Sequence, residues 1–430
     1  RSGSERRDML ELHAVFLTVV VGTELSFATL SLLNVRHGAA TVAERTEWVT
    51  ERLGVDDTER LLDYQRAGTG LSLLRSVVGL AVVLLVLYSG LFGDAVAAIE
   101  RIALPPVARG VVFFVGLVTA VRIAGAPFSL YETFVVEEQF GFNQQSPRLW
   151  VRDFLVGLGV SIVLTAIVAG GVLLTLSLLP EWWWIGAWGL FVAFSLAMLV
   201  IYPRVIAPLF YEFEPIESGD LRDAVDDVFE RAGFACEQVY QMDASSRSSH
   251  SNAYFVGFGR TKRVVLFDTL IEQMDHGEIK SVLAHELAHW KKGHIWKQLA
   301  SSALRIGIVL GVFAVLIEQP WLYGMFGVPE TAYAGLALGA LWIEPLLRLS
   351  APLENKLSLA HEREADSFAV EVMGGGVALA DALANLTSEN LANPFPHPLY
   401  ATFHYTHPPI PERIRYIESE GDAASDSDPG

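Results

Sequence analysis

The segment VLAHELAHWKKGH at residues 282–294 contains the residue types of a metal site. His285 and His289 are four residues apart, so on a helix they share one face and can present ring nitrogens to a single ion. Glu286 is one step further round the helix, where it can hold a metal-bound water and take its proton. Because H-E-x-x-H also arises by chance, a helix end with ordinary hydrogen-bonded histidines is the alternative. The motif alone predicts two zinc ligands and a base.

A catalytic zinc ion needs a third protein ligand and an open position. His294 follows His289 by five residues, which on one helix places it on a different face. The segment HEREADSFA (361–369) offers a better candidate, because Glu362 and Asp366 are four residues apart. We expect Glu362 to bind the metal and Asp366 to accept a hydrogen bond that orients a ligand histidine.

The composition indicates a membrane protein. Of the 430 residues, 52% are hydrophobic and 19% charged, whereas soluble domains carry about a quarter charged residues. The net charge of −18 argues against a nucleic-acid partner, because phosphate binding needs a basic surface. The single cysteine, Cys236, excludes intrachain disulfide bonds and a cysteine-based zinc site. Abundant acids with few lysines favour a halophilic archaeal source; codon bias is the alternative explanation.

Seven segments are long and apolar enough to cross a bilayer, which takes about 20 residues. They are Leu10–Leu33, Leu71–Phe92, Val107–Phe128, Phe154–Leu179, Trp183–Tyr202, Leu299–Tyr323 and Ala332–Leu349. Within the polar region that follows the fifth span, an amphipathic helix is predicted over 219–233. Short strands are predicted over 239–243, 252–259 and 263–271.

The predicted fold is a mainly α membrane protein with a small α+β domain on one membrane face. Its expected order is five spans with their loops (1–203), the domain part with the HExxH helix (204–298), spans six and seven (299–350), the part with the ExxxD helix (351–418) and a disordered acidic tail (419–430). The last two spans form a hairpin that returns Glu362 to the membrane side of His285. Lysine and arginine concentrate in the loops on the side of the small domain, so that side is expected to be cytoplasmic.

Together these segments resemble the type I CAAX prenyl endopeptidase family of integral-membrane zinc metalloproteases, with the HtpX-type proteases as more distant relatives. The resemblance covers most of the chain from about residue 130 onward. It rests on blocks in the family's order: EEQFGFNQQS (137–146), APLFYEFEPIESGDLR (207–222), SSRSSHSNAYFVGFGRTKRVVLFDTLI (245–271), HELAHWKKGH (285–294), EREADSFA (362–369) and NPFPHPLYATFHYTHPPIPERI (393–414). The chain departs from the family at Ser358-Leu359, where the family has Ser-Arg, and at His361.

The resemblance implies seven helices around a large water-filled intramembrane chamber, capped by the metalloprotease domain. It implies one zinc ion with three protein ligands, His285, His289 and Glu362. It also implies that Glu286 is the general base.

The resemblance also implies residues that contact the substrate. Asn252, Ala253 and Tyr254 resemble the family's edge strand, which pairs with an extended peptide. His407 and Arg413, in the segment HPPIPER, resemble residues that contact substrate and stabilise the oxyanion.

The predicted function is therefore hydrolysis of peptide bonds in prenylated CAAX-type or other membrane-associated peptides by a monomer in the bilayer. An HtpX-like quality-control protease is the alternative within the enzymes. A transporter or channel is the alternative of another class, since charged residues such as Arg75 and Arg122 lie inside predicted spans.

Overall fold

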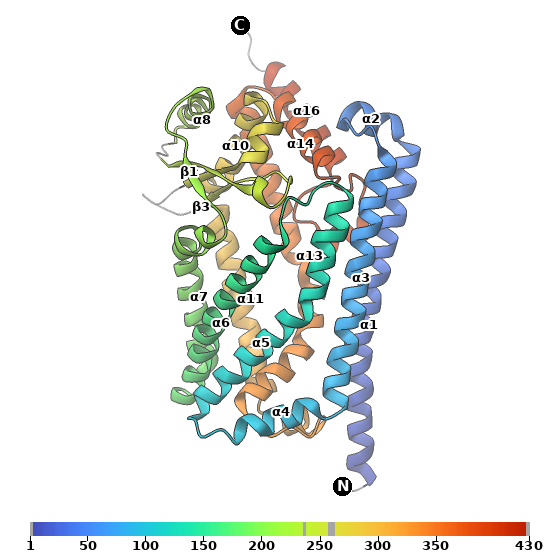
Figure 1. Ribbon diagram of the computed structural model, residues 1–430, viewed down its shortest axis with the longest axis vertical. Coiled ribbons are helices and arrows are strands. Elements are labelled where there is room, and N and C mark those ends of the chain that lie inside the picture. Colours follow the sequence, from blue (N-terminus) through green and yellow to red (C-terminus); the bar gives the residue numbers. More distant parts are fainter. Residues whose placement is uncertain (1–2, 235–237, 257–262, 427–430) are drawn as a thin grey trace.

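The structure, a computed structural model, describes residues 3–234, 238–256 and 263–426. Cys236 lies outside these ranges. Long helices make up the body of the molecule, and a small sheet gathers with shorter helices at one end (Figure 1). The N- and C-termini lie at opposite ends of the long axis, as an odd number of spans requires (Figure 1).

Helices precede and follow the sheet. Those before it are α1 (Gly3–Glu44), α2 (Thr46–Leu53), α3 (Thr58–Tyr88), α4 (Leu91–Glu100), α5 (Pro106–Tyr131) with its continuation η1 (Glu132–Glu137), α6 (Pro147–Leu178) and α7 (Trp183–Ile201). Those within and after it are α8 (Asp220–Arg231), α9 (Asp268–Gln273), α10 (His276–Lys291), α11 (His294–Leu316), α12 (Pro320–Gly324), α13 (Ala332–Met373), α14 (Val377–Glu389), α15 (Pro398–His404) and α16 (Ile410–Asp426).

Within the described residues, seven helices are long and apolar enough to cross a membrane, which confirms the predicted number of spans. Their ends differ from the predicted ones. The first helix extends well beyond Leu10–Leu33, because polar residues outside the bilayer continue it to Glu44. The sixth span was predicted to run to Tyr323, but α11 ends at Leu316, because Pro320 cannot donate the backbone hydrogen bond that would continue the helix.

Buried apolar side chains concentrate at the two ends of the helical body. One large core joins α10, α13, α14 and α16 to the sheet, and includes Leu283 and Ile417. A second core, which includes Phe16 and Leu322, lies at the opposite end around α4 and α12. Between the two cores, few residues are buried. In the most apolar 18-residue stretch of each span, at most 22% of the residues are buried. Most side chains in these stretches therefore keep some exposed surface, although neighbouring spans such as α5 and α6 lie in close contact. The water-filled chamber itself stays a prediction.

The sheet has four strands among the described residues: β1 (Phe213–Pro215), β2 (Val239–Met242), β3 (Ala253–Val256) and β4 (Arg263–Phe267), in the order β1-β2-β4-β3. β3 pairs with β4 in an antiparallel register and is an edge strand. The predicted strand over 263–271 is too long, because the Asp268 carboxylate accepts the Thr269 N–H and begins α9.

The amphipathic helix predicted over 219–233 is α8, and its chain reverses through Gly233 at φ 61°. The C-terminal helix α16 extends to Asp426, into the segment expected to be disordered. Its buried residues Ile414 and Ile417 anchor it to the core, and Gly421 packs closely on Gly376.

Two arginines inside the spans have polar partners. Arg75 forms an ion pair with Glu132 at 3.0 Å, and Arg122 donates a hydrogen bond to Ser161 at 2.9 Å. Both contacts fit the expectation that a charge at membrane depth faces a partner or a cavity.

Candidate metal centre

The HExxH helix α10 is held at both ends. At its start, the Asp275 carboxylate accepts the Glu278 N–H while the Glu278 side chain accepts the Asp275 N–H, which satisfies two otherwise unpaired backbone donors. At its other end, Gly293 adopts φ 70°, a conformation that favours glycine. Ile279, Leu283 and Leu287 are fully buried on one face of the helix. The adjoining face presents His285 and His289.

The seventh span brings a glutamate to these histidines. α13 continues without a break from the membrane to Met373, so it carries Glu362 directly against α10. The Nε2 atoms of His285 and His289 lie 3.2 Å apart. In the Glu362 carboxylate, Oε2 lies 3.4 Å from the His285 nitrogen and Oε1 lies 3.3 Å from the His289 nitrogen.

These separations fit a shared metal ion. Ligand atoms that each lie about 2.0–2.1 Å from a tetrahedral zinc ion are about 3.3–3.4 Å from one another. The Glu362 Oε2 atom is buried and has no hydrogen-bond partner among the described residues. Two facing nitrogens and one unpartnered carboxylate oxygen form the donor set that a zinc ion prefers.

Asp366 lies behind the first histidine. Its Oδ1 atom is 2.9 Å from the Nδ1 atom of His285, so the ring nitrogen that faces away from the cluster donates to it. Arg413 donates two further hydrogen bonds to Asp366, at 2.8 and 2.7 Å. Arg413 is 6% exposed, and its Nη2 atom lies 3.6 Å from Glu362. The guanidinium thus orients the carboxylate that orients His285.

Glu286 lies on α10 beside the cluster. Burial raises the pKa of its carboxyl group above the ordinary value. A raised pKa suits a group that must accept and return a proton near neutral pH.

His407 lies on the loop between α15 and α16, at the rim of the cluster. Its Nε2 atom is 3.4 Å from Glu362 Oε1, and its side chain is 59% exposed. Thr406 Oγ1 lies 3.0 Å from the other ring nitrogen and fixes the ring. The imidazole can therefore meet a ligand that enters the cluster.

The residues expected to bind an extended peptide lie at the sheet edge. Ala253 and Tyr254 belong to β3, whose outer side pairs with no other strand of the described chain. The side chain of Asn252 accepts the Ala253 N–H, and its carbonyl accepts the Phe267 N–H. α10 packs against β3, so the free edge runs beside the helix that carries His285.

The sequence does not predict that His294 and Glu364 support the second histidine. His294 is 1% exposed, and its Nδ1 atom lies 3.0 Å from Nδ1 of His289. Its Nε2 atom lies 2.9 Å from Glu364, and its ring stacks on His361 at 4.1 Å. On one continuous helix, His294 would lie on a different face from His289. The chain instead turns at Gly293 and begins a new helix at His294, which places the two histidine rings in contact.

A bundle of membrane-spanning helices with a His-His-Glu cluster and a partly buried glutamate beside it defines the class of integral-membrane metallohydrolases. Two family models match the chain. The model described as the CAAX prenyl protease N-terminal region with five membrane helices matches residues 36–212, and Peptidase family M48 matches residues 215–421.

Known proteins resemble the chain over most of its length. The CAAX prenyl protease 1 homolog of Arabidopsis thaliana is 36% identical over 329 residues, 75% of this chain and 77% of the relative. CAAX prenyl protease 1 of Saccharomyces cerevisiae is 34% identical over 332 residues, 71% of each chain. The crystal structure of S. mikatae Ste24p has a TM-score of 0.78 at 26% identity, over 92% of this chain and 98% of that chain.

The chain therefore belongs to peptidase family M48 and is an integral-membrane zinc metalloendopeptidase. This assignment decides against the transporter or channel alternative.

Proposed function

We propose that one zinc ion per chain is held by His285, His289 and Glu362. The observation that carries the proposal is the convergence of their ligand atoms at 3.2–3.4 Å. When bound, zinc lowers the pKa of its water and polarises the carbonyl of the peptide bond. One chain supplies every ligand, so the site is complete in a monomer, the state we propose.

Glu286 is the proposed general base and acid. It takes a proton from the attacking water and returns it to the amine of the leaving peptide, a role worth about 10²–10⁴-fold in rate. His407 is the proposed hydrogen-bond donor to the oxyanion, because its imidazole is exposed at the rim of the cluster. Arg413 adds positive charge from behind and holds Asp366, which in turn holds His285.

The free edge of β3 is the proposed platform for the substrate backbone. An extended peptide can add to this edge as a further strand through main-chain hydrogen bonds, at Asn252, Ala253 and Tyr254. We propose that residues 204–298 and 351–418 form the catalytic domain and that 1–203 and 299–350 form the membrane part. α13 crosses the border at residue 350 within a single helix.

Prenylated CAAX-type peptides are the proposed substrates, because the relatives matched over most of the chain are named for that activity. An HtpX-like role in quality control predicts instead that unmodified membrane peptides are cleaved as well as prenylated ones. We further propose that the active site faces the cytoplasm, on the strength of the lysine and arginine distribution. The acid-rich composition supports a halophilic archaeal source.

The replacement Glu286→Gln tests the catalytic proposal. The variant should keep one zinc ion per chain while losing about 10²–10⁴-fold in cleavage of a farnesylated peptide, because glutamine cannot accept the proton. Metal content and cleavage rate are measured on the same purified sample. Glu272→Gln, at an exposed glutamate on α9, serves as the control. Wild-type cleavage by the Glu286 variant would refute the role of Glu286.

A further inference from the structure

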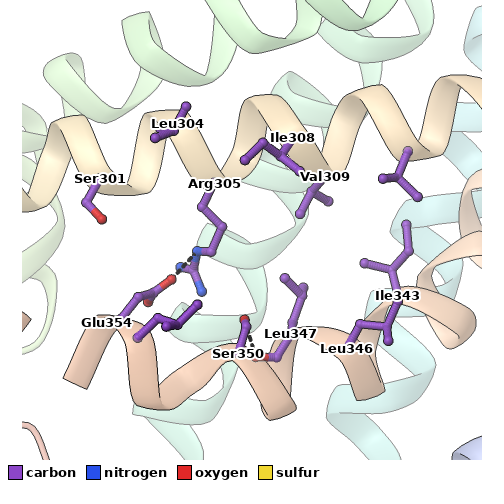
Figure 2. Close-up of a pocket in the computed structure, with 12 residues that line it drawn as sticks. Ser301, Leu304, Arg305, Ile308, Val309, Ile343, Leu346, Leu347, Ser350 and Glu354 are labelled. Carbon is purple, nitrogen blue, oxygen red and sulfur yellow. Dashed lines mark hydrogen bonds and ion pairs between the residues drawn. The ribbon is translucent and has the colours of Figure 1, made fainter. Parts of the chain in front are cut away.

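α11 and α13 are consecutive spans that pack closely at one end and separate toward the metal centre. At the packed end, a Cβ on Gly339 would lie 2.9 Å from the Phe313 ring. Toward the metal centre, the facing side chains leave a cleft of about 390 Å³ (Figure 2). Its apolar walls come from Leu304, Ile308 and Val312 of α11, and from Ile343, Leu346 and Leu353 of α13.

An ion pair lies in the wall of this cleft. Arg305 of α11 and Glu354 of α13 face each other at 2.6 Å, and both side chains are 38% exposed (Figure 2). Charged groups at membrane depth face cavities or partners, because hydrocarbon solvates them poorly. Arg305 and Glu354 satisfy each other in this way, and together they place polar atoms in the otherwise apolar wall of the cleft.

A second, polar cavity adjoins the cleft on the side of the metal centre. It has a volume of about 200 Å³, shares Ser301 and Glu354 with the cleft, and adds Ser358 and Thr406 to the lining. Thr406 contacts His407, whose ring faces the ligand Glu362. The polar cavity thus adjoins the cleft through Ser301 and Glu354, and its lining residue Thr406 contacts a histidine that lies beside the ligand Glu362.

We propose that the cleft between α11 and α13 binds the isoprenoid chain of a prenylated substrate while the peptide lies at the metal centre. The proposal rests on the proposed function. The change from polar to apolar lining matches a ligand with a polar end and an apolar tail. Glu354 precedes the ligand Glu362 by eight residues, about 12 Å along a helix. A farnesyl group, with C–C bonds of about 1.5 Å, extends roughly 15 Å. Its distal part therefore reaches the apolar walls.

Two other apolar cavities are rivals for this role. One, of about 480 Å³, lies between α5, α6 and α11 around Val168, and shares no lining residue with the polar cavity. The other, of about 610 Å³, lies around Met198 and Trp296. Neither cavity shares a lining residue with the cleft. A substitution in one of the three spaces therefore tests that space alone as the isoprenoid site.

The test compares two peptides of one sequence, one S-farnesylated and one S-methylated, with the full-length protein. Ile308→Trp fills the cleft, and Val168→Trp fills the cavity between α5, α6 and α11. The ratio of kcat/KM for the farnesylated peptide to that for the methylated peptide should fall at least tenfold in the Ile308 variant, mainly through KM. The Val168 variant should keep the wild-type ratio. An unchanged ratio in the Ile308 variant, or an equal loss for both peptides, would overturn the proposal.

Cross-linking provides a second measurement that does not depend on turnover. A farnesyl peptide that carries a diazirine, bound to the Glu286→Gln variant, should label segments 301–312 and 343–354. Labelling confined to 164–172 or 195–203 would assign the isoprenoid to a rival cavity. If the wild-type protein cleaved neither peptide, the proposed function would fail, and the labelling pattern would still decide where the isoprenoid binds.

Discussion

At the scale of single residues, the two ligand histidines are supported in different ways. His285 donates to Asp366, a carboxylate that Arg413 also holds. His289 instead contacts the imidazole ring of His294. If the metal occupies Nε2 of His289, its Nδ1 carries the proton, so Nδ1 of His294 must accept it. The remaining proton of His294 then lies on Nε2, which faces Glu364. Only this set of tautomers satisfies the chain of contacts.

His294→Ala should therefore weaken metal binding, because His289 loses the acceptor that orients its ring. Loss of such a partner costs about 10–100-fold in metal affinity. His294→Asn should restore most of it, since the asparagine oxygen can accept the same hydrogen bond. Zinc release to a chelator and the spectrum of the cobalt-substituted protein measure the effect apart from activity. Equal zinc retention in the alanine variant and the wild-type protein would exclude this role.

The site residues differ in how far sequence alone could predict them. The pairs His285 with His289 and Glu362 with Asp366 are four residues apart within helices, so local spacing predicts that each pair shares a face. No local pattern distinguishes Arg413, because its position depends on how α16 packs against α13. Only the family resemblance predicts that Arg413 belongs to the site.

At the scale of elements, one histidine joins the catalytic domain to a loop at the membrane. His250 lies 3.2 Å from Glu137 and 2.7 Å from Asn390, and its ring stacks on Phe142. Burial lowers the pKa of His250, but the hydrogen bonds to Glu137 and Asn390 outweigh it and leave the pKa raised above 6.5. The protonated ring, which donates from both nitrogens, is thus favoured in the folded protein.

The stability of this junction should depend on pH. A raised folded-state pKa gives stability that is fully present below about pH 6.5 and is lost as the pH rises through the folded-state value. Because the ring is 35% exposed, we expect about 0.5 kcal/mol. His250→Gln should reduce the fall in melting temperature between about pH 6 and pH 8.5, whereas His276→Gln, at an exposed histidine, should not. An identical pH profile for all three proteins would contradict the assignment.

The contact between α14 and α16 depends on a glycine. A Cβ at Gly376 would overlap the backbone carbonyl of Ile417, which cannot rotate away. Gly376→Ala should therefore destabilise the protein by about 1–3 kcal/mol and displace α16, which carries Arg413. Gly375→Ala is the matched control, because its Cβ would meet no described atom within 4 Å. Thermal unfolding measures both, and equal stability of the two variants would show that α16 accommodates the methyl group.

Element boundaries were harder to predict than element types. The predicted strands contain all of β2, β3 and β4, and residues 257–259 of the second prediction lie outside the described residues. The pattern misses β1, which has three residues and ends in proline. The error at Asp268 arises because an apolar run does not reveal where a side chain begins to bond its own backbone.

At the scale of the whole molecule, the number of spans could be predicted because hydropathy is a local property. The low burial in the middle of the spans could not be predicted from the sequence. An apolar residue looks the same in a sequence whether it faces lipid, a cavity or another helix. The two separate cores became visible only when distant segments were placed together.

The proposed sidedness can be measured with single cysteines in a Cys236→Ser background. Ser218 lies between β1 and α8, elements at the end that carries the metal centre, and Ala103 lies between α4 and α5, which meet at the opposite end (Figure 1). Both residues are exposed. In intact cells, an impermeant maleimide should label Ala103→Cys, whereas Ser218→Cys should react only after permeabilisation. The reverse pattern would place the metal centre outside the cell.

The continuity of α13 has a consequence for the surrounding lipid. Its 42 residues form a rod about 60 Å long, in which one stretch lies in the bilayer and another carries Glu362. No loop separates the two, so the depth at which the membrane holds the rod also sets the height of the carboxylate above α10. A shift of α13 along its axis relative to α10 would therefore move the Glu362 carboxylate relative to His285 and His289, so the thickness of the bilayer would influence the spacing of the three ligands.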